Sequence, residues 1–139
     1  MSNYDASALK AELTCDEGYR LRLYVDTVGK VSGGIGRNLT DKGLRPDEVD
    51  LMYANDISEA EAWLDHNLPW WQSLDPVRQR VLMNMAFNLQ GRLLEFRNFL
   101  ASVERHDWPV AKREMLDSRW AQEVGARATR LASMMETGV

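Results

Sequence analysis

The sequence predicts an α+β fold that is mostly helical. From Pro46 onward, apolar residues recur at three- and four-residue steps, which is the period of amphipathic helices. Before that point, an alternating segment at 21–25 and a glycine-rich segment at 32–36 predict a small hairpin sheet. With 139 residues, 45% of them hydrophobic and 27% charged, the chain has the composition of a globular domain that can bury a core.

The N-terminal part is predicted to contain a short helix followed by the hairpin. Leu9 and Leu13 lie on one helical face, and we expect this helix to end near Gly18. Residues 26–30 are typical of a turn and lead from the first strand to the second. The three glycines of the second strand permit a positive φ or a close approach of another part of the backbone.

The remainder of the chain is predicted to be helical. Pro46 suits the first turn of a long helix over about 46–66. Asp75 followed by Pro76 is a typical helix start, and the apolar run after it predicts a helix at the centre of the core. Gly91 is expected to end that helix. Shorter helices are expected at about 96–104, 108–116 and 126–135.

These elements predict a single domain with two lobes. The N-terminal lobe is expected over about 14–45 and the connecting helix over about 46–66. The helical C-terminal lobe is expected over about 67–139, together with the N-terminal helix at 6–15.

Composition and charge argue against several classes of function. Cys15 is the single cysteine, so no internal disulfide is expected. Residues 1–75 carry 14 acidic against 7 basic side chains, which argues against nucleic-acid binding. No stretch has the apolar length of a membrane span, and the first residues lack the basic and apolar regions of a secretory signal, so we expect neither stable membrane insertion nor a signal peptide. Because His66 and His106 have no further ligand at metal spacing, we expect no metal and no cofactor.

Two carboxylates stand out by their positions. Glu17 lies just past the first helix beside Gly18, and Asp26 lies where a strand runs into a turn. Glycosidic cleavage needs a carboxylic acid to protonate the leaving oxygen and a second carboxylate to activate water or attack the sugar carbon. The chain has 21 acidic residues, so by themselves these two can equally be surface carboxylates.

The spacing of these residues is more specific. The segment 16–36 closely resembles the signature of the phage-type lysozymes, glycoside hydrolase family 24. In this signature a Glu is followed after eight residues by an Asp, and the Asp is followed after five residues by a hydroxyl residue just before a G-I-G turn. Glu17, Asp26 and Ser32 occupy these three positions without a gap. Similar landmarks follow in order to the end of the chain: Pro46-Asp47-Glu48, the run from Arg78 to Phe87, Ser118-Arg119-Trp120, Arg127 and Thr137-Gly138.

The resemblance implies a lysozyme-like fold and a role for each member of this trio. Glu17 is implied as the general acid, and Asp26 is implied to position or activate the attacking water together with the hydroxyl of Ser32. The family inverts the anomeric configuration. Ser32 stands where the family usually has Thr, which keeps the hydroxyl but leaves its side-chain torsion less restricted.

The resemblance also implies contacts outside the trio. Asn88, which follows Phe87, falls where the family often has a polar residue at the floor of the substrate cleft, and both residues are expected to bind substrate. Asn88 can equally be a helix-capping or internally bonded amide. Arg127 matches an arginine that steadies the catalytic Glu. Arg37 stands where a relative has a His that pairs with an Asp, and Asp56 matches that Asp. We therefore expect an ion pair between Arg37 and Asp56 across the lobes.

By this resemblance the protein is expected to be a bacteriolytic endolysin of phage origin. It would act as a monomer on peptidoglycan glycan strands, at the β-1,4 bond between N-acetylmuramic acid and N-acetylglucosamine. It would accumulate in the host bacterial cytoplasm and reach the periplasmic cell wall by holin-dependent release. Two alternatives stay open: a lytic transglycosylase, which needs no water-positioning carboxylate, and a catalytically weak peptidoglycan-binding phage structural module.

Overall fold

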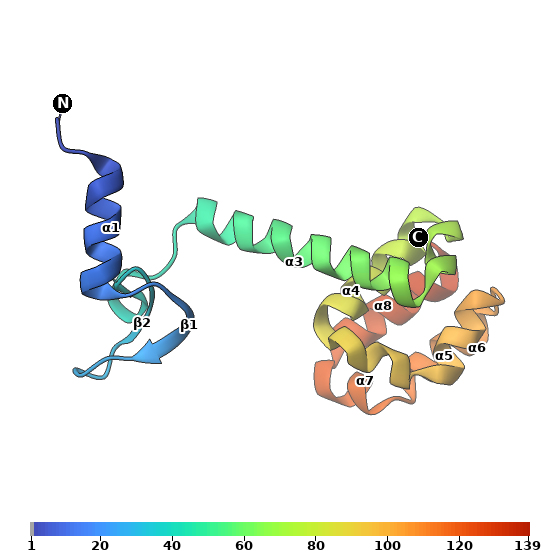
Figure 1. Ribbon diagram of the computed structural model, residues 1–139. Coiled ribbons are helices and arrows are strands. Elements are labelled where there is room, and N and C mark those ends of the chain that lie inside the picture. Colours follow the sequence, from blue (N-terminus) through green and yellow to red (C-terminus); the bar gives the residue numbers. More distant parts are fainter. Residues whose placement is uncertain (1) are drawn as a thin grey trace. The chain divides into compact units, whose positions relative to one another are not determined.

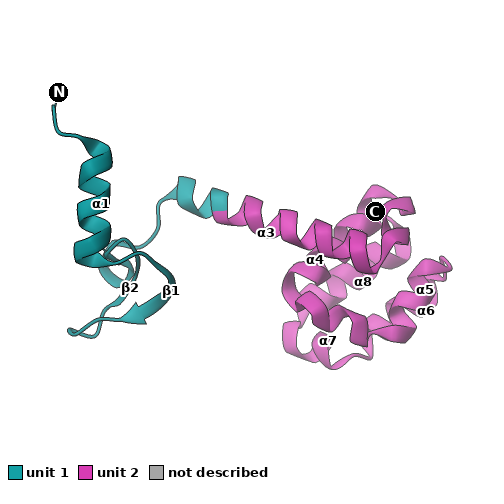
Figure 2. Ribbon diagram, viewed as in Figure 1, with its two compact units in different colours: residues 1–51 teal, residues 52–139 magenta. Residues whose placement is uncertain are grey.

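The computed structural model describes residues 2–139, which divide into two compact units at Leu51/Met52 (Figure 2). Unit 1 contains α1 (Ala6–Glu17), β1 (Arg20–Val25), β2 (Val31–Gly34), β3 (Arg37–Asn38), α2 (Leu39–Lys42) and the first turns of α3 (Pro46–Asn67). Unit 2 contains the rest of α3, η1 (Pro69–Ser73), α4 (Pro76–Leu89), η2 (Gln90–Glu95), α5 (Arg97–Glu104), α6 (Trp108–Leu116), α7 (Arg119–Val124) and α8 (Ala126–Thr137). The expected mostly helical α+β fold is confirmed.

The boundary between the units falls inside the predicted connecting helix, which is confirmed as one continuous helix, α3. The predicted attachment of the N-terminal helix to the C-terminal lobe concerns the placement of the two units, and it stays a prediction. Among residues 2–139, no helix combines the length and the apolar character that a membrane span needs.

Helix α1 begins and ends with local hydrogen bonds. The side chain of Asp5 accepts a hydrogen bond from the Ala8 N–H at 3.0 Å, which satisfies one of the free donors of the first turn. At the other end Gly18 has φ +88°, and its N–H donates to the Thr14 carbonyl at 3.0 Å. The helix therefore stops where the sequence predicts, and Glu17 is its last residue.

The sheet of unit 1 is antiparallel, in the order β1-β2-β3. Tyr24 pairs with Ser32, and Gly33 pairs with Arg37. A Cβ atom at Gly33 would lie 2.8 Å from Cδ2 of Leu23, so the absence of a side chain lets Leu23 lie directly on the second strand. The predicted hairpin is confirmed.

Unit 1 has no hydrophobic core of its own. Within residues 2–51 only Ser32 and Gly33 are buried. The apolar side chains of β1 that alternate along the strand are exposed, with Leu21 at 86%. The shape of unit 1 therefore depends mainly on strand pairing, helix caps and hydrogen-bonded turns.

Unit 2 is built around α4, which lies beside α8 (Figure 1). Asp75 caps α4 by accepting a hydrogen bond from the Arg78 N–H at 3.1 Å, and Pro76 occupies the first turn, as predicted. Val81, Leu82 and Met85 of α4 have no exposed surface. The core around them comes from α3 and from the helices that follow α4: Leu64, Leu93, Phe99, Val103, Ala111, Met115, Trp120, Leu131, Ala132 and Met135.

The expected stop of α4 at Gly91 is wrong by one residue. The helix ends at Leu89, and it is Gln90 that has a positive φ, +53°. Its N–H donates to the carbonyl of Ala86, and the chain then continues into η2, which contains Gly91. The chain leaves the helix before it reaches the glycine.

The expected helices at 96–104, 108–116 and 126–135 are confirmed as α5, α6 and α8. Helices α2 and α7 and both 3-10 segments were not predicted from the sequence, because they are too short for a hydrophobic period to be recognised. Helix α7 nevertheless has a local start signal, because the Ser118 hydroxyl accepts a hydrogen bond from the Ala121 N–H at 3.1 Å.

Arg78 holds the C-terminal end of α8 against α4. Its Nε donates to the Met135 carbonyl at 2.7 Å, and its Nη2 donates to the Glu136 carbonyl at 2.9 Å. Its Nη1 donates to Asp75 at 3.0 Å, and the guanidinium lies 3.8 Å from the ring centroid of Trp108. One side chain thus satisfies two carbonyls at a helix end and adds a cation–π contact.

We therefore expect Arg78→Ala to lower the free energy of unfolding of unit 2 by about 2–4 kcal/mol, because charge-assisted hydrogen bonds and a stacked guanidinium are lost together. All five tryptophans lie within residues 52–139, so urea unfolding followed by tryptophan fluorescence reports on this unit. Arg130→Ala, at an exposed position of α8, is the control and should change stability by less than about 0.5 kcal/mol. Equal losses in both variants would contradict this role of Arg78.

Candidate active site

The carboxylate of Asp26 organises the turn between β1 and β2. Its Oδ1 accepts hydrogen bonds from the N–H groups of Val28 at 3.0 Å and Lys30 at 2.9 Å. The Asp26 backbone closes the same turn, since its N–H donates to the Lys30 carbonyl at 2.8 Å and its carbonyl accepts from Gly29 at 3.1 Å. The orientation of this carboxylate is therefore fixed by the backbone around it, and Oδ2 is left for other partners.

Ser32 lies on β2 directly opposite the end of β1. Its side chain is buried, with 4% of the residue exposed, and its Oγ lies 3.5 Å from Oδ2 of Asp26. This separation exceeds the usual distance of an O–H···O hydrogen bond, so the hydroxyl is near the carboxylate without being held tightly by it. The structure thus brings together two of the three residues that the sequence analysis singled out.

Glu17 lies close to Gly36, which is in the turn that follows β2. A Cβ atom at Gly36 would lie 2.8 Å from both Cβ and Oε2 of Glu17, closer than real side chains come. Gly36 also has φ +66°, a conformation that disfavours other residues. Only glycine lets the turn after β2 run directly along the Glu17 carboxylate. The repeated glycines of the G-I-G turn were the available signal for this contact, but the sequence did not indicate which residue would use it.

Arg37 forms an ion pair within unit 1, with Glu48 in the first turn of α3. Glu48 also accepts a hydrogen bond from the Arg45 N–H at 3.1 Å, at the start of the same helix. The hydrogen bond from Arg37, helped by that from Arg45, lowers the pKa of Glu48 from 4.5 to about 2. The same pairing raises the pKa of Arg37. The sequence did not indicate Glu48 as the partner of Arg37. The expected pair of Arg37 with Asp56, which would join the two units, stays a prediction.

The other predicted site residues lie in unit 2. The side-chain oxygen of Asn88 accepts a hydrogen bond from the indole N–H of Trp120 at 2.7 Å. This oxygen is therefore bonded within the protein, as in the second of the two roles considered for Asn88. Arg127 binds Asn84 through Nε at 2.9 Å and Nη2 at 2.7 Å, both to Oδ1. Phe87 is 42% exposed.

Phe87 and Arg127 line the same groove of unit 2, which has a volume of about 590 Å³. Asn84, which binds Arg127, also lines this groove. It lies in the run from Arg78 to Phe87, and no sequence pattern assigned it a role. The expected contact between Arg127 and Glu17 would join the two units and stays a prediction. Among residues 2–139, no group of three or more His, Cys, Asp or Glu side chains is arranged to hold a metal ion.

Comparisons with known proteins extend the resemblance to nearly the whole chain. The chain is 27% identical to probable T4-type lysozyme 1 of Dictyostelium discoideum over 162 aligned positions, which cover 95% of each protein. It is 26% identical to probable T4-type lysozyme 2 of the same organism, again with 95% of each protein covered. No protein-family model matches the chain.

A further match links the chain to a phage protein. It is 26% identical over 152 aligned positions to the pre-baseplate central spike protein Gp5 of Enterobacteria phage T4. The match covers 88% of the chain but 26% of the spike protein.

The similarity to T4-type lysozymes, with which the mostly helical α+β fold is consistent, indicates an enzyme of the lysozyme class, which is a class of glycoside hydrolases. Within that class, the chain is a relative of the phage-type lysozymes, represented by the T4-type lysozymes that it matches along nearly its whole length.

The Arg37–Glu48 pair predicts a defined response to acid. Because the pKa of Glu48 is lower in the folded chain than its ordinary value, the pair stabilises the connection from β3 to α3 above about pH 4.5. Its contribution is lost as the pH falls through about 2. We expect a side-chain carbon NMR titration of Glu48 to give a midpoint near 2, and Arg37→Gln to move that midpoint toward 4.5.

The control is Asp47→Asn, which removes the neighbouring carboxylate of the same helical turn, whose side chain is 72% exposed. Its effect on the Glu48 midpoint should be small, since Asp47 pairs with Arg45 rather than with Arg37. A Glu48 midpoint near 4.5 in the unaltered chain would show that the ion pair does not form in solution.

Proposed function

We propose that the protein is a muramidase of the glycoside hydrolase family 24 type. It hydrolyses the β-1,4 bond between N-acetylmuramic acid and N-acetylglucosamine in peptidoglycan. The observation that carries the proposal is the arrangement of Asp26 and Ser32, because a backbone-fixed carboxylate with a hydroxyl 3.5 Å from its second oxygen suits a water-activating site. The similarity to T4-type lysozymes along the chain supports the choice of substrate.

In this mechanism Glu17 is the general acid. Its carboxyl group donates a proton to the glycosidic oxygen as the bond to the sugar carbon breaks, and it is left as a carboxylate. The contact with Gly36 supports this role, since it restricts the position of the carboxyl group without a competing hydrogen bond from that residue. Gly18 ends the helix immediately after Glu17, which places this carboxyl group at a helix terminus.

Asp26 and Ser32 act on the attacking water. The Oδ2 atom of Asp26 accepts a proton from the water as the water oxygen bonds to the anomeric carbon, and the Ser32 hydroxyl orients the same water. The 3.5 Å separation of Oγ and Oδ2 supports shared binding of a water, because a tight direct bond would occupy both groups. Attack by water in a single displacement inverts the anomeric configuration.

We further propose that residues of unit 2 bind the glycan. Phe87 offers an exposed ring, and the side-chain NH₂ of Asn88 can donate to a sugar, since Trp120 uses the oxygen of the same amide. Arg127 is proposed to steady Glu17. Its Nη1 is the guanidinium nitrogen that does not donate to Asn84 in the described structure.

For its biological setting we propose a monomeric phage endolysin that needs no cofactor and does not bind nucleic acid. It would accumulate in the host cytoplasm and reach the wall by holin-dependent release. The similarity to the T4 spike protein Gp5 supports the phage setting and favours, as the alternative, a module of the virion. The lytic transglycosylase alternative is disfavoured because that reaction would leave Asp26 and Ser32 without a role.

The general-acid role predicts that Glu17→Gln lowers lysis of outer-membrane-permeabilised Gram-negative cells by at least about 100-fold, while circular dichroism stays unchanged. The matched control is Glu12→Gln, an exposed position on the same helix, which should keep full activity. Mass spectrometry of the products should show reducing muramic acid ends. Full activity of Glu17→Gln would refute the role, and anhydro ends would indicate transglycosylation.

If the Ser32 hydroxyl orients the attacking water, variants at position 32 should differ in turnover number according to whether they keep a hydroxyl. Ser32→Thr should keep or raise the turnover number, because the hydroxyl remains and its torsion is more restricted. Ser32→Ala should lose about tenfold to 100-fold in turnover number with a smaller effect on KM, because water positioning matters mainly in the transition state. An alanine variant with unchanged turnover would leave only the two carboxylates in the mechanism.

A further inference from the structure

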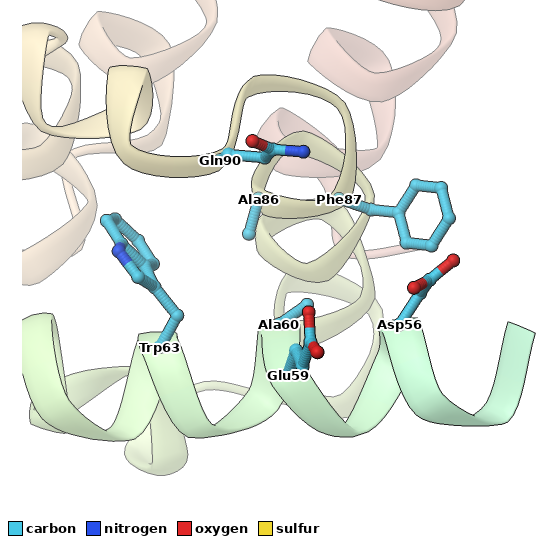
Figure 3. Close-up of a pocket in the computed structure, with 7 residues that line it drawn as sticks. All are labelled: Asp56, Glu59, Ala60, Trp63, Ala86, Phe87 and Gln90. Atoms are coloured by element: carbon cyan, nitrogen blue, oxygen red, sulfur yellow. The ribbon is translucent and has the colours of Figure 1, made fainter. Parts of the chain in front are cut away.

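The residues proposed to bind the glycan and the groups proposed to act on water lie in different units. Phe87 lines the groove of unit 2 described above and also a pocket of about 370 Å³ between α3 and α4, where its ring lies beside Asp56 (Figure 3). Asp26 and Ser32 lie on the hairpin of unit 1, and the hydrogen bonds described for them are made within that unit. The contacts of the hairpin inside unit 1 therefore bear directly on the proposed chemistry.

The peptide group between Lys30 and Val31 is held on both sides. Its carbonyl oxygen, which belongs to Lys30, accepts a hydrogen bond from the Asp26 N–H at 2.8 Å. Its N–H, which belongs to Val31, donates to Oγ1 of Thr40 at 2.8 Å. Because a peptide group is planar and rigid, fixing its N–H also fixes the direction of its carbonyl. One peptide group thus connects the side chain of Thr40 to the backbone of Asp26.

Thr40 can hold this N–H because β3 is short. Strand β2 pairs with β3 at Ser32–Asn38 and Gly33–Arg37, and directly after Asn38 the chain turns into α2 (Leu39–Lys42). Val31 therefore lies one residue beyond the last of these pairs. The hydroxyl of Thr40, in the first turn of α2, accepts the hydrogen bond that a carbonyl of a longer β3 would accept.

The restrained peptide group lies between the two groups proposed to hold the attacking water. It comes immediately before Ser32 in the chain, so its orientation sets the path of the backbone that carries the Ser32 hydroxyl. It is also bonded to Asp26, whose Oδ1 accepts from the N–H of Lys30 at 2.9 Å. A rotation of this peptide group would change the separation of Ser32 Oγ and Asp26 Oδ2, which is 3.5 Å.

An ion pair makes a second link between the same segments. Nζ of Lys30 lies 3.0 Å from Oδ1 of Asp41, the residue after Thr40. The two side chains are 38% and 59% exposed, and an ion pair of this kind restrains geometry weakly, because solvent screens it and a lysine side chain keeps much of its freedom. The Thr40 hydroxyl is on a short, β-branched side chain and binds the backbone directly, so the restraint is assigned to Thr40.

We propose that Thr40 is a positioning residue for the attacking water, acting through the peptide group between Lys30 and Val31 on the Ser32 hydroxyl. This inference rests on the proposed function, in which Asp26 and Ser32 act on that water. Thr40 is exposed, so water can replace its hydroxyl as the partner of the Val31 N–H without holding that group in place. Loss of the hydroxyl should therefore preserve the fold and loosen the geometry of the site.

The kinetic test compares two substitutions at position 40, with soluble glycan strands from purified peptidoglycan as the substrate. Thr40→Val keeps the shape of the side chain without the hydroxyl, and it should lower the turnover number by about three- to tenfold with less than about a twofold change in KM. Thr40→Ser keeps the hydroxyl and should retain at least about half of the turnover number. The control is Thr137→Val, which removes an exposed, hydrogen-bonded hydroxyl at the end of α8 and should keep full turnover.

A double-variant cycle separates positioning from a general loss of stability. In a Ser32→Ala background, Thr40→Val should cost less than about twofold in turnover number, because the hydroxyl that Thr40 places is already absent. A weakened fold would lower turnover by the same factor in both backgrounds, and that result would overturn the proposal. A loss in Asp41→Asn equal to that in Thr40→Val would also overturn it, because the ion pair would then supply the restraint.

NMR without substrate tests the geometry independently of catalysis. Thr40→Val should speed hydrogen exchange of the Val31 N–H and average the side-chain torsion of Ser32, and Thr40→Ser should restore both. If the chain lyses cells through Glu17 but Thr40→Val has unchanged turnover, only the role of Thr40 is lost. If the chain does not lyse cells, the muramidase reaction is lost, and the NMR result alone decides: an unchanged Val31 exchange rate and Ser32 torsion would then refute the restraint by Thr40.

Discussion

The Asp26 carboxylate is the group on which the proposed site most depends. Unit 1 buries no hydrophobic side chain, so the hairpin that carries the site has no core to hold it in shape. Two backbone hydrogen bonds to Oδ1 close the turn and at the same time fix where Oδ2 lies relative to Ser32. Oδ1 of Asp26 thus stabilises the turn, and Oδ2 is the oxygen proposed to act on the attacking water.

The two units are stabilised in different ways. Unit 2 packs large apolar residues around α4 and closes the end of α8 with the charged side chain of Arg78. Unit 1 relies on caps, strand pairing and the Arg37–Glu48 ion pair. Because burial of apolar surface is the main source of stability in folded domains, the residues proposed for catalysis lie on the weaker of the two units.

Local sequence signals predicted most of the fold. Asp75 and Pro76 marked the start of α4, and Gly18 marked the end of α1, because caps involve residues only a few positions apart. Contacts between distant residues were harder to predict. The Trp120–Asn88 bond spans 32 positions, and nothing in either local pattern names the partner. The roles of Glu17, Asp26 and Ser32 were predicted from a spacing that resembles that of the phage-type lysozymes, and they stay predictions. The contact of Glu17 with Gly36 depends on how the turn after β2 folds, which no local pattern indicates.

Because the two oxygens of Asp26 have different roles, a single substitution at this position could remove one role and keep the other. Asparagine in its place would keep one side-chain oxygen to accept from Val28 and Lys30, and its amide group could donate to the Ser32 hydroxyl. The turn would survive while the proton acceptor vanished. An aspartate codon becomes an asparagine codon by a single nucleotide change. A wall-cutting enzyme of this design therefore lies one mutation away from a folded, inactive domain that selection could retain for binding alone.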